Sequence, residues 1–193
     1  MDQIYLDYNA TTPVDPEVAA EMLPYLEEYF GNPSSMHSFG IKSREAVEKA
    51  RTRVAMLLNC LPQEIIFTSG GTESNNMALK GAAFALRSKG NHIIISAVEH
   101  PAVTEVVNYL ATQGFEISVA PVDEFGLVDP EDIRNLLRPG TVLVSVMHAN
   151  NEVGTVQPLK SIAAIVHQHG ALMHTDAAQS AGKIPVDVQD LGV

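Results

Sequence analysis

From about residue 64 onward, short apolar runs alternate with longer segments in which apolar residues recur every three or four positions. The short runs predict buried strands, and the longer segments predict amphipathic helices. The predicted strands are Glu64 to Thr68, Asn91 to Ala97, Phe115 to Val119, Thr141 to Met147 and Ala171 to Thr175. Five strands separated by helices predict an α/β fold with a mainly parallel sheet and flanking helices.

Helix-start and helix-stop residues mark the segments between these strands. The predicted helices are Thr72 to Lys89, Pro101 to Gln113, a short helix capped by Asp129 and ended by Pro139-Gly140, and Leu159 to His169. A glycine directly follows three of them, at positions 90, 114 and 170, as is typical of helix ends. Both the apolar periodicity and the residues at the helix ends therefore support the predicted alternation of strand and helix.

The first sixty residues lack this alternation. Asp15-Pro16 predicts a helix start, and Pro24 should kink or end that helix. After a loop at 31–35, a second helix is predicted from near Phe39 to Leu58, with one apolar face. We interpret residues 1–60 as an N-terminal arm with helices and residues 61–193 as the first part of a larger domain. No cap or polar tail precedes Val193, which predicts a sheet incomplete at the C-terminus.

The net charge of the chain argues against some classes of binding partner. Twelve Lys and Arg against 23 Asp and Glu give a net charge of −11, which argues against nucleic acid and against an anionic membrane surface. No run approaches the roughly 18 apolar residues of a membrane span, and Met1-Asp2-Gln3 does not open a signal peptide. The single cysteine, Cys60, excludes an internal disulfide and a multi-thiolate zinc site. We therefore expect a cytoplasmic protein without a metal site.

Ligands of open parallel sheets bind beyond the carboxyl ends of the strands, so the residues that follow each predicted strand are candidates. Gly70-Gly71-Thr72 follows the first strand, where glycine backbone and a helix start favour phosphate. The alternative is a plain turn with Thr72 as the helix cap. His100 follows the second strand, where the helix dipole favours a neutral imidazole that stacks on a flat ligand or moves a proton. The alternative is a capping or surface histidine.

Two further strand ends carry amide and carboxylate groups. Asn150 and Asn151 follow the fourth strand, as turn residues or as amide donors to a ligand oxygen. Asp176 follows the fifth strand, either as a helix cap or as a ligand carboxylate with Gln179 three residues further on. Together, these groups suit a flat, phosphorylated ring that contains nitrogen. Pyridoxal 5'-phosphate is such a ligand, because its ring nitrogen needs an acidic partner to serve as an electron sink.

Six stretches, in order along the chain, resemble the cysteine desulfurases, within the class V aminotransferase group of pyridoxal-phosphate enzymes. They are YLDYNATTP at 5–13, GNPSS at 31–35, FTSGGTES at 67–74, EH at 99–100, MHANNEVG at 147–154 and HTDAAQSAGK at 174–183. The resemblance is to the N-terminal half of that family. It implies an aminotransferase fold-type-I large domain, with residues 61–193 as the first part of its pyridoxal-phosphate-binding domain.

The same resemblance implies roles for individual positions. The cofactor-binding positions would be Gly71, Thr72, His100, Asn151, Asp176 and Gln179. The two residues at 71 and 72 would hold the phosphate, and those at 151 and 179 would address the phenolic oxygen. Asp176 would pair with the ring nitrogen, and His100 would stack on the ring and help move protons as the catalytic residue.

The family reaction removes sulfur from L-cysteine, leaving alanine and a persulfide on an enzyme cysteine. Sulfur then passes to a sulfur-acceptor or iron–sulfur scaffold protein, and the family enzymes are homodimers. The family's Schiff-base lysine and persulfide cysteine would lie beyond Val193, so this chain alone is expected to be inactive. Cys60 is expected to be a buried structural thiol, and Lys183 a solvated loop residue. The alternatives are a non-catalytic truncated paralogue that acts as a scaffold, a selenocysteine lyase, or another class V transaminase.

Overall fold

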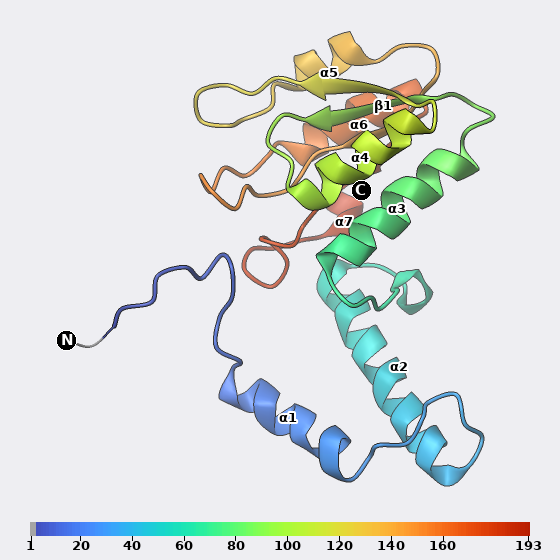
Figure 1. The fold of residues 1–193 in the computed structure, drawn as a ribbon, viewed down its shortest axis with the longest axis vertical. Coiled ribbons are helices and arrows are strands. Elements are labelled where there is room, and N and C mark those ends of the chain that lie inside the picture. Colours follow the sequence, from blue (N-terminus) through green and yellow to red (C-terminus); the bar gives the residue numbers. More distant parts are fainter. Residues whose placement is uncertain (1–2) are drawn as a thin grey trace. The chain divides into compact units, whose positions relative to one another are not determined.

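The computed structural model describes residues 3–193 and divides the chain after Ile65 into two compact units (Figure 1). We call them the N-terminal unit, up to Ile65, and the C-terminal unit, Ile66–Val193. The acidic start at Met1 and Asp2 lies outside the described residues. The assignment of residues 61–193 to a cofactor-binding domain stays a prediction. Among the described residues, no helix is long and apolar enough to cross a membrane.

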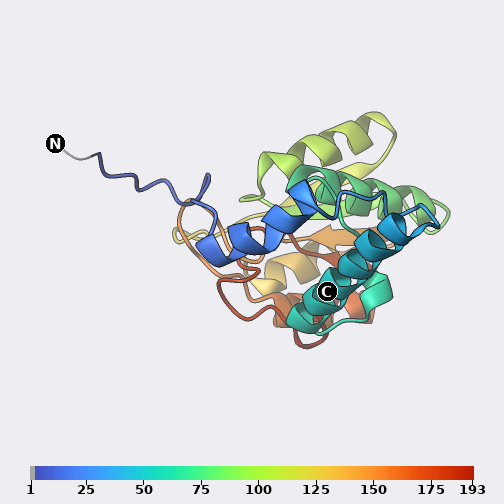
Figure 2. The same cartoon turned by 90° about the horizontal axis from the view of Figure 1, so that it is seen from below.

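The N-terminal unit consists of α1 (Pro16–Glu27), α2 (Ser38–Leu58) and the short 3-10 helix η1 (Pro62–Glu64), with a loop between α1 and α2 (Figure 2). Asp15 caps α1 as predicted, since its carboxylate accepts the N–H of Glu17 at 2.8 Å. Pro24 lies inside α1, so the helix does not end there. The last turn forms after it because the N–H groups of Glu28 and Tyr29 both donate to the Pro24 carbonyl, which needs no N–H from the proline.

Asn59 ends α2 in the left-handed conformation at φ 55°, and Cys60 is the next residue. Its side chain is half-buried, so the expectation of a buried thiol is only partly met. Partial burial, together with the nearby Glu64 carboxylate, raises the pKa of the Cys60 thiol. A thiol that keeps its proton is a poor nucleophile, which agrees with the absence of a catalytic match at this position.

The C-terminal unit is built on a four-stranded sheet in the order β2-β1-β3-β4, with every neighbouring pair parallel. The strands are β1 (His92–Ser96), β2 (Glu116–Ala120), β3 (Thr141–Ser145) and β4 (Leu172–His174). The helices are α3 (Gly71–Ala85), α4 (Pro101–Thr112), α5 (Pro130–Leu136), α6 (Leu159–His169) and α7 (Val188–Leu191). The predicted α/β fold with a parallel sheet and flanking helices is confirmed.

Several predicted elements differ from the structure. No cap was expected before Val193, but Gly192 in the left-handed conformation ends α7 there. The strand predicted to reach Met147 ends at Ser145. The predicted strand at Glu64 to Thr68 is wrong: the segment leaves η1, pairs with no strand, and exposes Ile66 and Phe67 by 65% and 48%. An apolar run becomes a strand only where a neighbouring edge pairs with it and buries it. The helix predicted to Lys89 ends at Ala85 and closes through turns up to Gly90. The helix predicted to reach Pro139 ends at Leu136.

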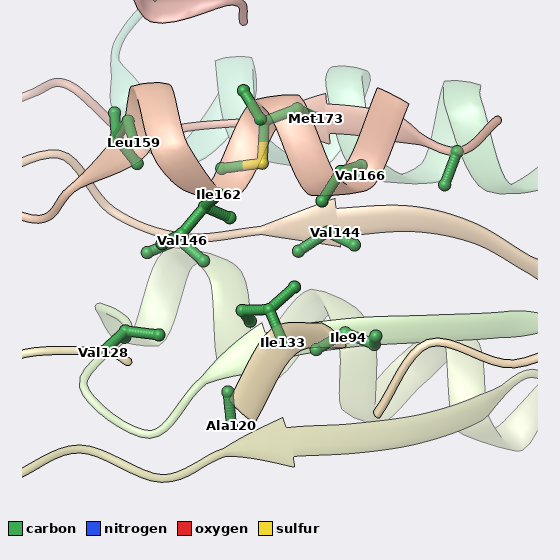
Figure 3. Packing of buried hydrophobic residues seen from close by; sticks show 12 residues of the cluster. Ile94, Ala120, Val128, Ile133, Val144, Val146, Leu159, Ile162, Val166 and Met173 are labelled. Atoms are coloured by element: carbon green, nitrogen blue, oxygen red, sulfur yellow. The ribbon is translucent and has the colours of Figure 1, made fainter. Parts of the chain in front are cut away.

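Alternate residues of the central strands face two separate hydrophobic clusters, which makes three layers. Ile93 and Ile95 pack with residues of α3 and α4, such as Leu79 and Val103. Figure 3 shows the other face, where Ile94 and Val144 meet Ile133 of α5 and residues of α6. The further residues labelled there are Ala120, Val128, Val146, Leu159, Ile162, Val166 and Met173. Because helices cover both faces of the sheet, a ligand finds access at the strand ends.

This packing gives a first prediction. Ile93 is fully buried, so Ile93→Val should lower the free energy of unfolding of the 193-residue chain by about 1 kcal/mol, by removing one buried methylene. Ile66→Val makes the same chemical change at a side chain that is largely exposed, and it should change the free energy by less than about 0.5 kcal/mol. Urea denaturation measures both. Equal losses in the two variants would contradict the burial described here.

Candidate functional site

A cavity of about 200 Å³ opens at the carboxyl edge of the sheet in the C-terminal unit. Its lining comes from the start of α3 and from the segments that follow β1, β3 and β4. The lining residues are Gly71, Thr72, Asn75, His100, Ala102, Met147, Ala149, Asn151, Asp176, Ala178 and Gln179. The structure therefore brings all six predicted site residues, at 71, 72, 100, 151, 176 and 179, to one pocket. That they bind a cofactor stays a prediction.

The start of α3 forms one wall of the pocket. Gly70 is the residue at the N-cap, and no side chain caps the helix there, so Thr72 is not the cap. The first N–H groups of a helix have no acceptor within the helix, and they favour an anion. A Cβ built on Gly71 would meet no atom within 4 Å. Because Gly71 lines the pocket, its missing side chain leaves open space beside these donors and the Thr72 hydroxyl.

His100 is both the N-cap of α4 and a pocket residue. Its Nδ1 accepts the N–H of Ala102 at 3.0 Å. A ring nitrogen that accepts a hydrogen bond carries no proton, so this contact favours the tautomer with the proton on Nε2. The capping alternative therefore holds together with the functional one, because the cap fixes how the exposed ring is presented to the pocket.

The two asparagines after β3 differ in position: one is a turn residue, and the other lines the pocket. Asn150 is buried and shapes the turn, since its Oδ1 accepts the N–H groups of Glu152 and Val153 at 2.8 and 3.0 Å. Asn151 lines the pocket and donates through Nδ2 to Glu152 Oε1 at 3.0 Å. The turn built by the first asparagine thus presents the second one to the cavity.

Asp176 lies half-buried after β4 and accepts two hydrogen bonds. Its Oδ1 takes the N–H of Ala178 at 2.9 Å, and its Oδ2 takes the side-chain amide of Asn75 at 2.8 Å. Asn75 is buried on α3 and lines the pocket, yet the sequence reasoning missed it. Its position three residues after Thr72 puts both on one helix face, and that spacing is the signal that could have found it. The bond connects the helix that offers anion donors to the carboxylate.

Gln179 is held by a neighbour on its own segment. Its side-chain carbonyl accepts a hydrogen bond from Lys183 Nζ at 2.9 Å. An amide whose oxygen is bound in this way can present its NH₂ group as a donor. Lys183 is exposed, as expected of a loop residue, but it contacts a pocket residue as well.

Buried titratable groups lie next to the pocket residues. Glu99 is 8% exposed. Its Oε1 accepts hydrogen bonds from the Ser96 hydroxyl at 2.5 Å and from the N–H of Met147 at 2.7 Å. Burial raises the pKa of Glu99 to about 7, although both hydrogen bonds lower it, and the charge of Asp176 adds to the rise. Burial lowers the pKa of His174 to about 4. The sequence reasoning noted Glu99 only as the neighbour of His100.

The comparisons with known proteins show the family to which the chain belongs. The model of the family described as aminotransferase class-V matches residues 4–193. The chain belongs to the class-V aminotransferase family. Within it, the chain is 54% identical over 191 residues to the cysteine desulfurase IscS of Dictyoglomus turgidum, and 50% identical over 190 residues to that of Methanosarcina thermophila. These alignments cover 99% and 98% of the chain, but only 48% and 47% of the relatives.

Solved structures of this family share the fold. A NifS-like protein superposes with a TM-score of 0.96 at 43% identity, over 100% of this chain and 53% of that one. A structure described as SspA in complex with cysteine gives a TM-score of 0.93 at 39% identity, over 98% of this chain and 55% of that one. The chain thus spans about half the length of the relatives and solved structures that it matches. The resemblance to cysteine desulfurases is confirmed.

Proposed function

We propose that the chain is the cofactor-binding part of a cysteine desulfurase that uses pyridoxal 5'-phosphate. The substrate would be L-cysteine, the products alanine and an enzyme persulfide, and the recipient a sulfur-acceptor or iron–sulfur scaffold protein. At its natural length the protein would be a cytoplasmic homodimer. The observation that carries the proposal is the convergence of six separately predicted residues on one pocket, in a chain about half identical to cysteine desulfurases.

The pocket residues fit this cofactor chemically. The open space at Gly71, beside helix N–H groups and the Thr72 hydroxyl, suits a phosphate. The amides of Asn151 and Gln179 suit a phenolic oxygen, and a carboxylate at Asp176 suits a protonated ring nitrogen. When bound, pyridoxal phosphate supplies an electron sink for the substrate carbon atoms.

The protein's own part of the reaction is to orient, to hold charge and to move a proton. Asn75 donates to Oδ2 of Asp176 and Ala178 donates to Oδ1, so two donors fix the plane of the carboxylate. A carboxylate held in this way can accept the N–H of a ring nitrogen and keep it protonated. His100, with its Nδ1 engaged by Ala102, has only Nε2 left to donate or accept a proton at the pocket.

The direct test is an assay of the protein at its natural length with pyridoxal phosphate and L-cysteine. We expect alanine and sulfide in equal amounts in the presence of a thiol reductant, and neither product without the cofactor. Alanine and selenide from selenocysteine, with neither product from cysteine, would indicate a selenocysteine lyase instead. Bound cofactor with no product from either substrate would contradict the proposal and favour a non-catalytic scaffold.

A second prediction concerns the phosphate wall. Gly71→Leu would fill the open space beside the helix start, so we expect about tenfold weaker binding of pyridoxamine 5'-phosphate, a fluorescent analogue that binds reversibly. Gly81→Leu is the matched control: Gly81 lies in the same helix, and its Cβ would also meet open space, but it does not line the pocket. Fluorescence titration measures both affinities. Equal weakening in the two variants would exclude a phosphate site at Gly71.

A further inference from the structure

Glu99 joins the ends of two strands next to the pocket. It lies between β1 and α4, and its Oε1 accepts one bond from Ser96, the last residue of β1, and one from the N–H of Met147, just beyond β3. Met147 lines the pocket, and so does His100, the next residue after Glu99. The orientation of two pocket segments therefore depends on one buried carboxyl group.

The second oxygen of this carboxyl group is in an unusual position. Glu99 Oε2 is fully buried and has no hydrogen-bond partner among the described residues. A buried, unpaired carboxylate oxygen is strongly disfavoured unless it carries a proton. Glu99 is approached by Ser96 from β1, by Met147 from the segment after β3, and by the charge of Asp176 from the segment after β4. No cation is among these groups, so none of them compensates a negative charge on Glu99.

Asp176 has the opposite surroundings. It is half-buried, borders the pocket and accepts two hydrogen bonds, from Asn75 and Ala178. Glu99 also accepts two hydrogen bonds, but both go to Oε1, whereas Asp176 accepts one on each oxygen. Of two interacting carboxyl groups, the more deeply buried one, which has an unpaired oxygen, takes the proton. The pair therefore places its negative charge on Asp176, at the pocket, and its proton on Glu99, behind the pocket lining.

We propose that Glu99 is a positioning residue that acts as a neutral acid, tying the β1 and β3 ends together while Asp176 carries the negative charge of the pair. This inference rests on the proposed function and adds a dependence on pH. When Glu99 ionises, its unpaired oxygen must be hydrated, which pulls the side chain away from Ser96 and Met147. The pocket segments then lose their common anchor, and ligand binding weakens.

The test compares Glu99→Gln, a neutral isostere, with the wild-type protein at natural length and pyridoxamine 5'-phosphate as the probe. At about pH 6, Glu99→Gln should bind within about twofold of wild type, whereas Glu99→Leu, which cannot accept from Met147, should bind about tenfold more weakly. Between about pH 6 and pH 8.5, wild type should lose about tenfold in affinity relative to Glu99→Gln. Glu105→Gln, an exposed glutamate on α4, is the control and should follow wild type.

Three results would overturn the proposal. Glu99→Gln binding as weakly as Glu99→Leu at about pH 6 would show that the anion is needed. Parallel pH profiles of wild type and Glu99→Gln would show that Glu99 does not titrate with ligand binding, even if Glu99→Leu fails to fold. No binding by wild type at any pH would remove the proposed function itself, and this result is distinct from the other two.

Discussion

Replacing Asp176 with alanine is expected to lower the rate of alanine formation from L-cysteine by about 100-fold or more, in the protein at natural length. Among the described residues, Asp176 is the only carboxylate that lines the pocket, so in the variant a bound ring nitrogen would lose its acidic partner and the ring would be a weaker electron sink. It also leaves the buried amide of Asn75 without its acceptor.

Asp176→Asn separates these two effects. The asparagine can still accept the N–H of Ala178 through Oδ1, but its NH₂ group then faces the NH₂ group of Asn75, so the second bond returns only if the Asn75 amide turns over. Because the asparagine carries no charge, turnover should stay close to that of the alanine variant while stability recovers in part. Steady-state assays of alanine, together with thermal melts, measure both quantities. Turnover of either variant within about twofold of wild type would remove Asp176 from the role given to it here.

We also expect the difference in the free energy of unfolding between the wild-type chain and Glu99→Gln to depend on pH. Because burial raises the pKa of Glu99 from 4.5 to about 7 in the folded state, the folded protein binds more protons than the unfolded chain between these values. The stability from Glu99 is therefore present below about pH 4.5 and is lost as pH rises through about 7. We expect the free energy of unfolding of wild type to fall by about 3 kcal/mol relative to Glu99→Gln between about pH 5 and pH 8.

Only the difference between the two proteins isolates this contribution. Burial lowers the pKa of His174 to about 4 and also lowers the pKa of His92 and His148. These histidines add stability as pH rises through the acidic range, opposite to Glu99, but they are the same in both proteins and cancel. Urea denaturation at several pH values provides the measurement. A difference that does not change with pH would mean that Glu99 has an ordinary pKa.

The sequence predicted those elements whose limits depend on local chemistry. The helix from Leu159 to His169 has the predicted bounds because Gly170 adopts the left-handed conformation at its end. The strand predicted at Glu64 to Thr68 failed because pairing is not local: a strand requires a partner edge, and the apolar run alone does not say whether one is present. The helix predicted to Lys89 ran too far because Gly90 ends the turns after α3 rather than the helix itself.

The site residues also divide into those that local sequence indicates and those that only distant contacts reveal. Strand ends of a parallel sheet meet at one edge, so the residues that follow each predicted strand included His100, Asp176 and the pair Asn150 and Asn151. The choice of Asn151 over Asn150 came from the resemblance to the cysteine desulfurases. Asn75 was missed because its partner Asp176 is 101 residues away in sequence, and only the fold brings the two together. The positioning role of Glu99 was missed for a similar reason, since its hydrogen bond to the N–H of Met147 spans 48 residues.

A crystal structure of the protein at natural length with pyridoxal 5'-phosphate bound would test most directly whether the pocket at the sheet edge holds this cofactor. We expect the phosphate at the N-terminus of α3, against Gly71 and Thr72, and the ring nitrogen about 3 Å from a carboxylate oxygen of Asp176. His100 should lie against the ring face. A cofactor bound with its ring nitrogen away from Asp176, or a pocket that stays empty in saturating cofactor, would exclude the proposed cofactor site.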